Sequence, residues 1–147
     1  ALLFGTSSTQ PISGVSGEKR RNGLTAVDKV TGERLWNHSD KDVHQVIGHG
    51  DKIYAGVFTD ETASTDILNT QGKKIGSISV AGKMEFLNES LYIALDRLYS
   101  FSDTGERNWS DRFIEDDGGY LGIDSDEKFL YLLHTRPTPE LISVDPE

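Results

Sequence analysis

Short apolar segments, each closed by a turn signal, follow one another along the whole chain. Residues 2–4, 52–54, 90–92 and 129–131 each bring an apolar approach to an aromatic residue, at Phe4, Tyr54, Tyr92 and Tyr131. The aromatics recur at a spacing of roughly 40 residues, which is typical of repeated β units such as propeller blades. No stretch keeps a helical period over the roughly 10 to 12 residues that a helix needs. The pattern predicts an all-β protein.

A second landmark repeats in the same order as the aromatics. A polar residue opens a turn that ends in glycine, as DKVTG at 28–32, NTQG at 69–72 and SDTG at 102–105, and residues 141–147 enter a fourth copy. Glycine supplies the positive φ that such tight turns need. A tryptophan stands four residues beyond two of these glycines, at Trp36 and Trp109, and Gly76 holds that place in the remaining copy.

The two landmarks together predict four repeat units, at about 1–40, 41–82, 83–115 and 116–147. The expected strands are 2–5, 24–28 and 34–37; 43–47, 52–58, 65–68 and 74–80; 83–87, 90–95, 97–102 and 107–113; and 120–124, 129–134 and 140–144. The first unit lacks its first strand and the last unit lacks its fourth. We therefore expect about four blades of four-stranded antiparallel sheet, incomplete at both ends, and interpret the chain as a piece of a longer protein.

The segment AVDKVTGERLW at 26–36 resembles the tryptophan-docking motif of PQQ-like β-propeller repeats, the quinoprotein dehydrogenase type. The matching positions are Ala26, Asp28, Thr31, Gly32 and Trp36 in the first unit, and Thr104, Gly105 and Trp109 in the third. The resemblance implies a propeller of four-stranded, WD40-like blades in which the tryptophan of one blade packs on its neighbour. We expect Trp36 to be largely buried at such a seam.

The resemblance does not carry a quinone site into this chain. Quinoprotein enzymes hold their cofactor under a tryptophan and over a calcium bound by Glu, Asn and Asp, often beside a vicinal disulfide. This chain has no cysteine, and its two tryptophans both occupy docking positions. We predict no catalytic residues and no cofactor, and the lack of cysteine also excludes Cys-ligated zinc and CxxC redox sites.

Two acidic groups, at 115–117 and 124–127, offer oxygen ligands that calcium prefers. Neither group has the spacing of a known calcium loop, and both fall where a turn or a connection is expected, so we interpret them as solvated turns. His44 and His49 stand five residues apart, which places them on opposite faces of a strand. The sequence therefore predicts no metal site.

The charge of the chain restricts its partners. The net charge is −9, from 24 acidic and 15 basic residues, which argues against binding to nucleic acid. No run of about 18 apolar residues exists, so no membrane span is predicted. A long Ser/Gly-rich insertion at 6–23 carries the basic triplet Lys19, Arg20 and Arg21. This triplet is either part of a solvated loop or a contact site for an acidic partner or a second subunit.

Three of the five asparagines begin N-x-S sequons, at Asn37, Asn88 and Asn108. The sequons point to an exported or cell-surface protein. The alternative is that Asn and Ser are simply common at turns and strand ends.

Together these patterns predict a non-catalytic β-propeller repeat domain that acts as a scaffold or platform for protein binding or for a small-molecule ligand, rather than an enzyme. Two alternatives stay open: a segment of a PQQ-dependent dehydrogenase whose active-site blades lie elsewhere, and the sensor propeller of a larger membrane-tethered or signalling protein. Because missing strands leave exposed edges, we also expect the fragment to form a homo-oligomer, most simply a homodimer joined at the terminal blades.

Overall fold

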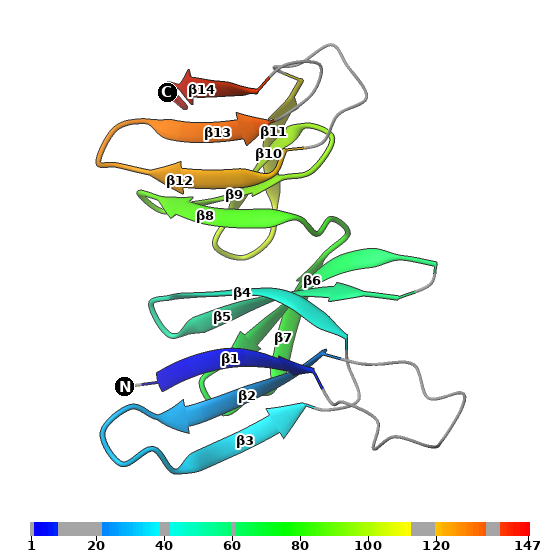
Figure 1. Ribbon diagram of the computed structural model, residues 1–147, viewed down its shortest axis with the longest axis vertical. Coiled ribbons are helices and arrows are strands. Elements are labelled where there is room, and N and C mark those ends of the chain that lie inside the picture. Colours follow the sequence, from blue (N-terminus) through cyan, green and yellow to red (C-terminus); the bar gives the residue numbers. More distant parts are fainter. Residues whose placement is uncertain (1, 9–21, 39–41, 60, 113–119, 135–138) are drawn as a thin grey trace. The chain divides into compact units, whose positions relative to one another are not determined.

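The computed structural model describes residues 2–8, 22–38, 42–59, 61–112, 120–134 and 139–147, and these residues form strands joined by turns (Figure 1). The strands are β1 (Leu2–Ser8), β2 (Asn22–Asp28), β3 (Arg34–His38), β4 (Val43–His49), β5 (Lys52–Phe58), β6 (Ala63–Asn69), β7 (Lys74–Ile78), β8 (Lys83–Leu87), β9 (Ser90–Ala94), β10 (Leu98–Ser102), β11 (Arg107–Asp111), β12 (Gly122–Ser125), β13 (Leu130–His134) and β14 (Glu140–Val144). The described part of the chain contains no helix, so the all-β prediction is confirmed.

The strands form four antiparallel sheets that follow one another along the chain. Their orders are β1-β2-β3, β4-β5-β6-β7, β11-β10-β9-β8 and β12-β13-β14, so each strand pairs with its neighbours in sequence. Two sheets have four strands and two have three, as the sequence predicts. Short glycine-containing turns explain this meander, because a tight hairpin returns each strand directly beside the one before it.

The first hairpin is longer than its apolar residues indicate. The sequence predicts a strand at 2–5 and another from residue 24, but the pairing of β1 with β2 continues to Ser8 opposite Asn22. Backbone hydrogen bonds extend a hairpin regardless of side-chain hydropathy, and threonine suits a strand. The loop of this hairpin, with Lys19, Arg20 and Arg21, lies outside the described residues.

A bulge recurs in the hairpin between the last two strands of the first three sheets. The register shifts between Ala26 and Val27 in the first sheet, and at the matching positions in the second and third. Such a bulge increases the local twist and re-aims the side chains near it. As a result Trp36 pairs directly with Ala26, and Trp109 pairs directly with Ser100.

The chain divides into two compact units, Ala1–Ser79 and Val80–Glu147, each built from two sheets. In unit 1 the buried core is formed by Leu24, Val43, Ile53, Ala55, Val57 and Leu68. In unit 2 it is formed by Leu87, Tyr92, Ala94, Leu98, Tyr120, Leu130, Leu132 and Val144. Each core lies between the two sheets of its unit. Alternate residues along a strand point to the same face of the sheet, and the inner faces of the two sheets pack together.

Candidate functional site

The turn between β2 and β3 is built by polar residues of the motif at 26–36. Asp28 Oδ1 accepts hydrogen bonds from the backbone N–H of Val30 at 2.8 Å and of Thr31 at 2.9 Å. These bonds, the one from Thr31 first, hold the pKa of Asp28 below its ordinary value. Thr31 Oγ1 accepts from Glu33 N–H, and Gly32 takes a φ of 73°. The polar residues here fix the turn.

The same cap opens the corresponding turn in the other three sheets. Asn69 Oδ1 accepts from the N–H groups of Gln71 and Lys73, and Ser102 Oγ accepts from that of Glu106. Asp145 Oδ1 accepts from Glu147 N–H, directly after β14. The position of Asp28 is therefore a structural one in every sheet.

Trp36 lies on the turn between β6 and β7, in the neighbouring sheet of unit 1. Its Nε1–H donates to the carbonyl oxygen of Thr70 at 2.9 Å. A Cβ added at Gly72 would lie 2.7 Å from Trp36 Cδ2, so the indole covers the glycine directly. The side chain falls in the intermediate range of exposure, with its indole resting on the backbone of the turn.

His38 lies two positions beyond Trp36 on β3 and contacts the same turn. The distance from His38 Nε2 to the carbonyl oxygen of Gly72 is 2.7 Å, and since a carbonyl only accepts, Nε2 carries the donated proton. The rings of Trp36 and His38 are 5.3 Å apart. Two side chains of β3 thus hold one turn of the next sheet.

Trp109 occupies the equivalent position on β11 in unit 2. It is half-buried, packs against the core of that unit and lies 6.0 Å from the ring of Tyr92. Its turn is built by Gly105, with a φ of 92°, and by Thr104, whose Oγ1 is 2.9 Å from Ser102 Oγ. Within the described residues, the indole N–H of Trp109 makes no hydrogen bond.

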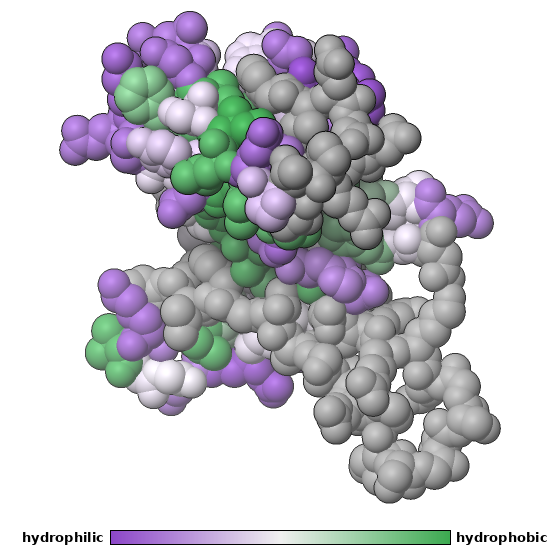
Figure 2. Space-filling model, turned by 45° about the horizontal axis from the view of Figure 1, so that its top comes forward, coloured by the Kyte–Doolittle hydropathy of each residue, from purple (hydrophilic) through white to green (hydrophobic). Residues whose placement is uncertain are grey.

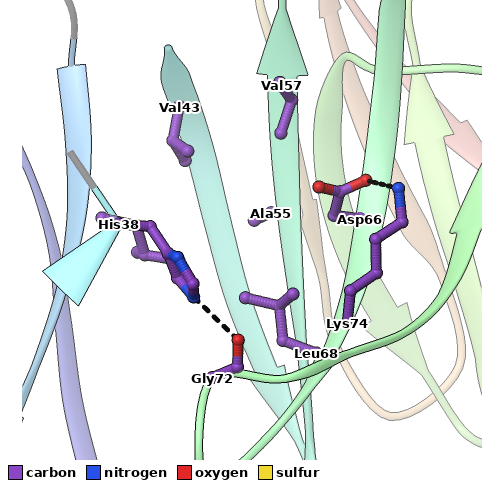
Figure 3. Close-up of a pocket in the computed structure, with 9 residues that line it drawn as sticks. His38, Val43, Ala55, Val57, Asp66, Leu68, Gly72 and Lys74 are labelled. Carbon is purple, nitrogen blue, oxygen red and sulfur yellow. Dashed lines mark hydrogen bonds and ion pairs between the residues drawn. The ribbon is translucent and has the colours of Figure 1, made fainter. Parts of the chain in front are cut away.

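A cavity of about 170 Å³ lies in unit 1 beside the contact of Trp36 and His38 (Figure 3). It is lined by Leu24, His38, Val43, Ala55, Val57, Asp66, Leu68, Gly72 and Lys74. In Figure 3 the side chains of Ala55 and Leu68 lie between two polar pairs, His38 with Gly72 on one side and Asp66 with Lys74 on the other. The cavity therefore combines apolar walls with a charged edge.

Asp66 places a carboxylate inside this cavity. Its side chain is 4% exposed, and its Oδ1 lies 2.7 Å from Nζ of Lys74, whose side chain is 50% exposed. Asp66 belongs to the interior strand β6, whereas Lys74 reaches across from the outer strand β7. A buried carboxylate requires such a partner, since an isolated buried charge is strongly unfavourable.

The first strands of the two sheets of unit 2 also bring two carboxyl groups together. Ser125 Oγ on β12 donates to the carbonyl oxygen of Phe86 on β8 at 3.3 Å. Burial raises the pKa of Glu85, on β8, and the negative charge of Asp124, on β12, raises it further. Glu85 is half-buried and Asp124 is exposed, and no third His, Cys, Asp or Glu among the described residues joins them as a metal ligand.

Three leucines are exposed at one end of unit 2. They are Leu95, Leu121 and Leu133, which are 41%, 54% and 43% exposed. The backbone joins them: Tyr120 N–H donates to the carbonyl oxygen of Leu95, and Leu121 N–H donates to that of Leu133. Figure 2 shows apolar residues reaching the surface in patches among hydrophilic ones. We call these three residues the leucine cluster.

The acidic and histidine positions singled out in the sequence are dispersed. Asp126 Oδ1 accepts from the N–H groups of Lys128 and Phe129, and its Oδ2 accepts from the hydroxyl of Tyr131 at 2.6 Å. The tyrosine bond is the main reason that the pKa of Asp126 is lowered. His44 lies 3.1 Å from Asp42 Oδ1, at the other end of β4 from His49. Residues 115–117 lie outside the described part.

Neither a metal centre nor a membrane helix is found in the described ranges. No group of three or more His, Cys, Asp or Glu side chains there could hold a metal ion. The described residues also include no helix long and apolar enough to cross a membrane.

Comparison with known proteins identifies the architecture. No protein-family model and no curated protein sequence matches this chain. Among solved structures, BamB from Moraxella catarrhalis superimposes with a TM-score of 0.68 over 84% of this chain, at 17% identity. The chain folds as β-propeller blades. The computationally designed Ika8 protein superimposes with a TM-score of 0.58 over 87% of the chain, at 12% identity.

The chain is shorter than either of these solved structures. The chain spans 40% of the length of BamB and 43% of the length of Ika8. The four sheets are therefore a partial set of blades compared with either protein. At this level of identity the likeness concerns the fold alone.

The cavity residues were not anticipated from the sequence. Asp66 stands directly before Ile67 and Leu68 in the run ASTDILN, and a charged residue beside apolar strand residues indicates a partner or a site. Lys74 and His38 carry no comparable local signal, because their roles depend on contacts across a hairpin and between sheets. The leucine cluster was likewise missed, since its members are far apart in sequence.

Proposed function

We propose that this chain is a PQQ-like β-propeller repeat domain whose role is to bind a partner protein rather than to catalyse a reaction. Its four repeat units would be those at about 1–40, 41–82, 83–115 and 116–147. Tryptophans at the docking positions, Trp36 and Trp109, serve the packing of blades in this account. Since these tryptophans serve packing, we look for the binding function on the exposed surface of the blades.

The observation that carries the proposal is the leucine cluster. Leu95, Leu121 and Leu133 are exposed on segments that backbone hydrogen bonds hold together, although each stands next to buried residues of its own strand or turn. Exposed apolar groups that gather in one place mark surfaces for protein contact more often than scattered ones do. The net charge of −9 favours a partner whose contact surface is apolar at its centre and basic at its rim.

A photo-crosslinking residue at position 121 tests this proposal. Introduced in place of Leu121, it is expected to give a covalent adduct with one partner in an extract of the source cells, and Leu95→Ser in the same protein should reduce that adduct at least tenfold. The matched control is the same residue at Val30, which is 83% exposed in the turn between β2 and β3. Equal adducts from both positions would contradict a specific surface.

A dehydrogenase segment is the competing function, and quinone binding distinguishes it. Titration with pyrroloquinoline quinone and calcium should give no saturable change in absorbance. Saturable binding would favour the dehydrogenase over the platform. The sensor propeller of a larger protein differs from both in its neighbouring sequence, where a membrane anchor or signalling domain would be encoded.

The homo-oligomer predicted from the sequence also stays a proposal, supported by an exposed position on β14. Leu141 precedes the turn cap Asp145 by four residues, as Leu24 precedes Asp28. Leu24 is 1% exposed beneath the second sheet, whereas Leu141 is 70% exposed. We expect another blade to cover Leu141, and a second copy of the chain would supply it. Light scattering that keeps a mass near 16.3 kDa at rising concentration would contradict the dimer.

The three sequons support an exported or cell-surface location. Their asparagines, Asn37, Asn88 and Asn108, are all exposed residues that a glycan could reach. The basic triplet Lys19, Arg20 and Arg21 is a further proposed contact for a partner.

A further inference from the structure

The cavity of unit 1 is suited to a small ligand rather than to a protein. Its volume is about 170 Å³, and Leu24, Val43, Ala55, Val57 and Leu68 give it apolar walls that are almost completely buried. Apolar cavities of about 150 Å³ hold a single aromatic ring. The body of a fitting ligand is therefore about the size of one ring.

The charged edge of the cavity decides which polar group the ligand carries. Asp66 is fixed on an interior strand and its side chain is almost fully buried, whereas Lys74 lies on an outer strand with half of its side chain in solvent. Lysine has a long flexible stem and can withdraw its ammonium group into water. The carboxylate is thus the permanent charge of the cavity, and the ammonium is its replaceable partner.

A ligand cation can take the place of the lysine without leaving Asp66 uncompensated. A ligand carboxylate, in contrast, would add a second negative charge close to a buried one, which is unfavourable. The net charge of −9 also raises the local concentration of cations over that of anions. Both arguments favour an amine over an acid.

We propose that the cavity beside Trp36 and His38 binds a small primary amine with an apolar body, whose ammonium group pairs with Asp66 in place of Lys74. The apolar body packs against Ala55, Val57 and Leu68. His38, held by its bond to Gly72, closes the wall toward β3. This site is separate from the leucine cluster, so the two proposals stand or fall independently.

Titration by NMR with benzylamine tests the site, because its ammonium and its single ring match the two halves of the cavity. The amine is expected to bind with a dissociation constant in the millimolar range or below, and to shift the signals of Ala55 and His38. Benzyl alcohol and benzoate, which have the same ring without the positive charge, should bind at least tenfold more weakly.

Three variants sharpen the test. Asp66→Asn keeps the shape and removes the charge, and it should weaken benzylamine binding at least tenfold. Lys74→Met removes the competing cation and should strengthen binding several-fold. Ala55→Ile fills the cavity with an apolar side chain that suits a strand, and it should abolish binding while the protein stays folded.

Several outcomes would overturn the proposal. These are absence of benzylamine binding to the unaltered protein, benzoate binding as tight as that of benzylamine, and retention of binding in Ala55→Ile. If Asp66→Asn does not fold, the comparison of the three ligands on the unaltered protein, together with Ala55→Ile, still decides between an amine site and none.

Discussion

In unit 1 the outer strand β3 is joined to the neighbouring sheet by hydrogen bonds from Trp36 and His38, whereas in unit 2 the outer strand β11 is held by packing. Trp36 donates to Thr70 and His38 to Gly72, both on one turn. In unit 2 Trp109 packs on the core, and Asp111, which holds the place of His38, is exposed. The tryptophan position of the repeat therefore makes a hydrogen bond to the next sheet in unit 1 and an apolar contact with the core in unit 2.

The difference follows from what each tryptophan meets. In unit 1 the β6–β7 turn offers two carbonyl groups and a glycine without a side chain, so an indole can lie flat on the backbone. In unit 2 the matching turn of the last sheet begins at Asp145, directly after β14. The hydrogen bonds of the seam in unit 1 thus depend on the receiving turn as well as on the motif.

Removing the indole from unit 1 should have the largest effect on stability. Trp36→Ala is expected to lower the free energy of unfolding by about 2 to 4 kcal/mol, since it removes a large packed ring and leaves the Thr70 carbonyl without its donor. Trp109→Ala should cost about half as much, because that indole makes no hydrogen bond in the described residues. Chemical denaturation measures both, and equal losses would remove the contrast between the units.

Adding a side chain at Gly72, beneath the indole of Trp36, should lower the free energy of unfolding by a smaller amount. Gly72→Ala is expected to cost about 2 to 3 kcal/mol, because residue 72 has a φ of 78° and the new Cβ would meet the Trp36 ring. Gly32→Ala is the matched control, since residue 32 has a φ of 73° with nothing within 4 Å of the added Cβ.

The control should cost only about 1 kcal/mol, which is the penalty of the backbone conformation alone. In the Trp36→Ala background the excess cost of Gly72→Ala over Gly32→Ala should vanish. If the two alanine variants were equally destabilised in the unaltered protein, Trp36 would not lie on Gly72.

Neutralising Glu85 in the carboxyl pair of unit 2 should give the smallest change in the free energy of unfolding, and it should stabilise the protein where the other variants destabilise it. Burial first, and the charge of Asp124 second, raise the pKa of Glu85 above 4.5, so the folded state holds this proton more tightly than the unfolded state. The protonated Glu85 therefore stabilises the fold at a pH below its pKa in the unfolded chain. This contribution is lost as the pH rises through its pKa in the folded protein.

At pH 7 Glu85→Gln is therefore expected to raise the free energy of unfolding by less than about 0.5 kcal/mol, because solvent screens this half-exposed pair. The gain should disappear near pH 3. Glu106→Gln, which removes the same charge on an exposed turn, is the control. A Glu85→Gln variant that is destabilised at pH 7 would show that the carboxylate is a favourable hydrogen-bond acceptor instead.

The fold could be predicted from the sequence because its signals are local. Turn glycines such as Gly32 and Gly105, and the aromatic at Tyr92, mark hairpins whose strands are close in sequence. The cavity of unit 1 could not be predicted, because Asp66 and His38 line it from different sheets. The contact of Trp36 with Gly72 could not be predicted in detail either, since the motif indicates packing but not which residues of the next sheet receive the indole.

The exchange of the two indole N–H protons with solvent is the most direct test of the seam in unit 1, because Trp36 donates a hydrogen bond to Thr70 and Trp109 donates none within the described residues. The indole proton of Trp36 should exchange slowly and show a nuclear Overhauser effect to the α-protons of Gly72, whereas that of Trp109 should exchange rapidly. Equal exchange of the two protons, with no effect between Trp36 and Gly72, would contradict a blade seam fastened by Trp36.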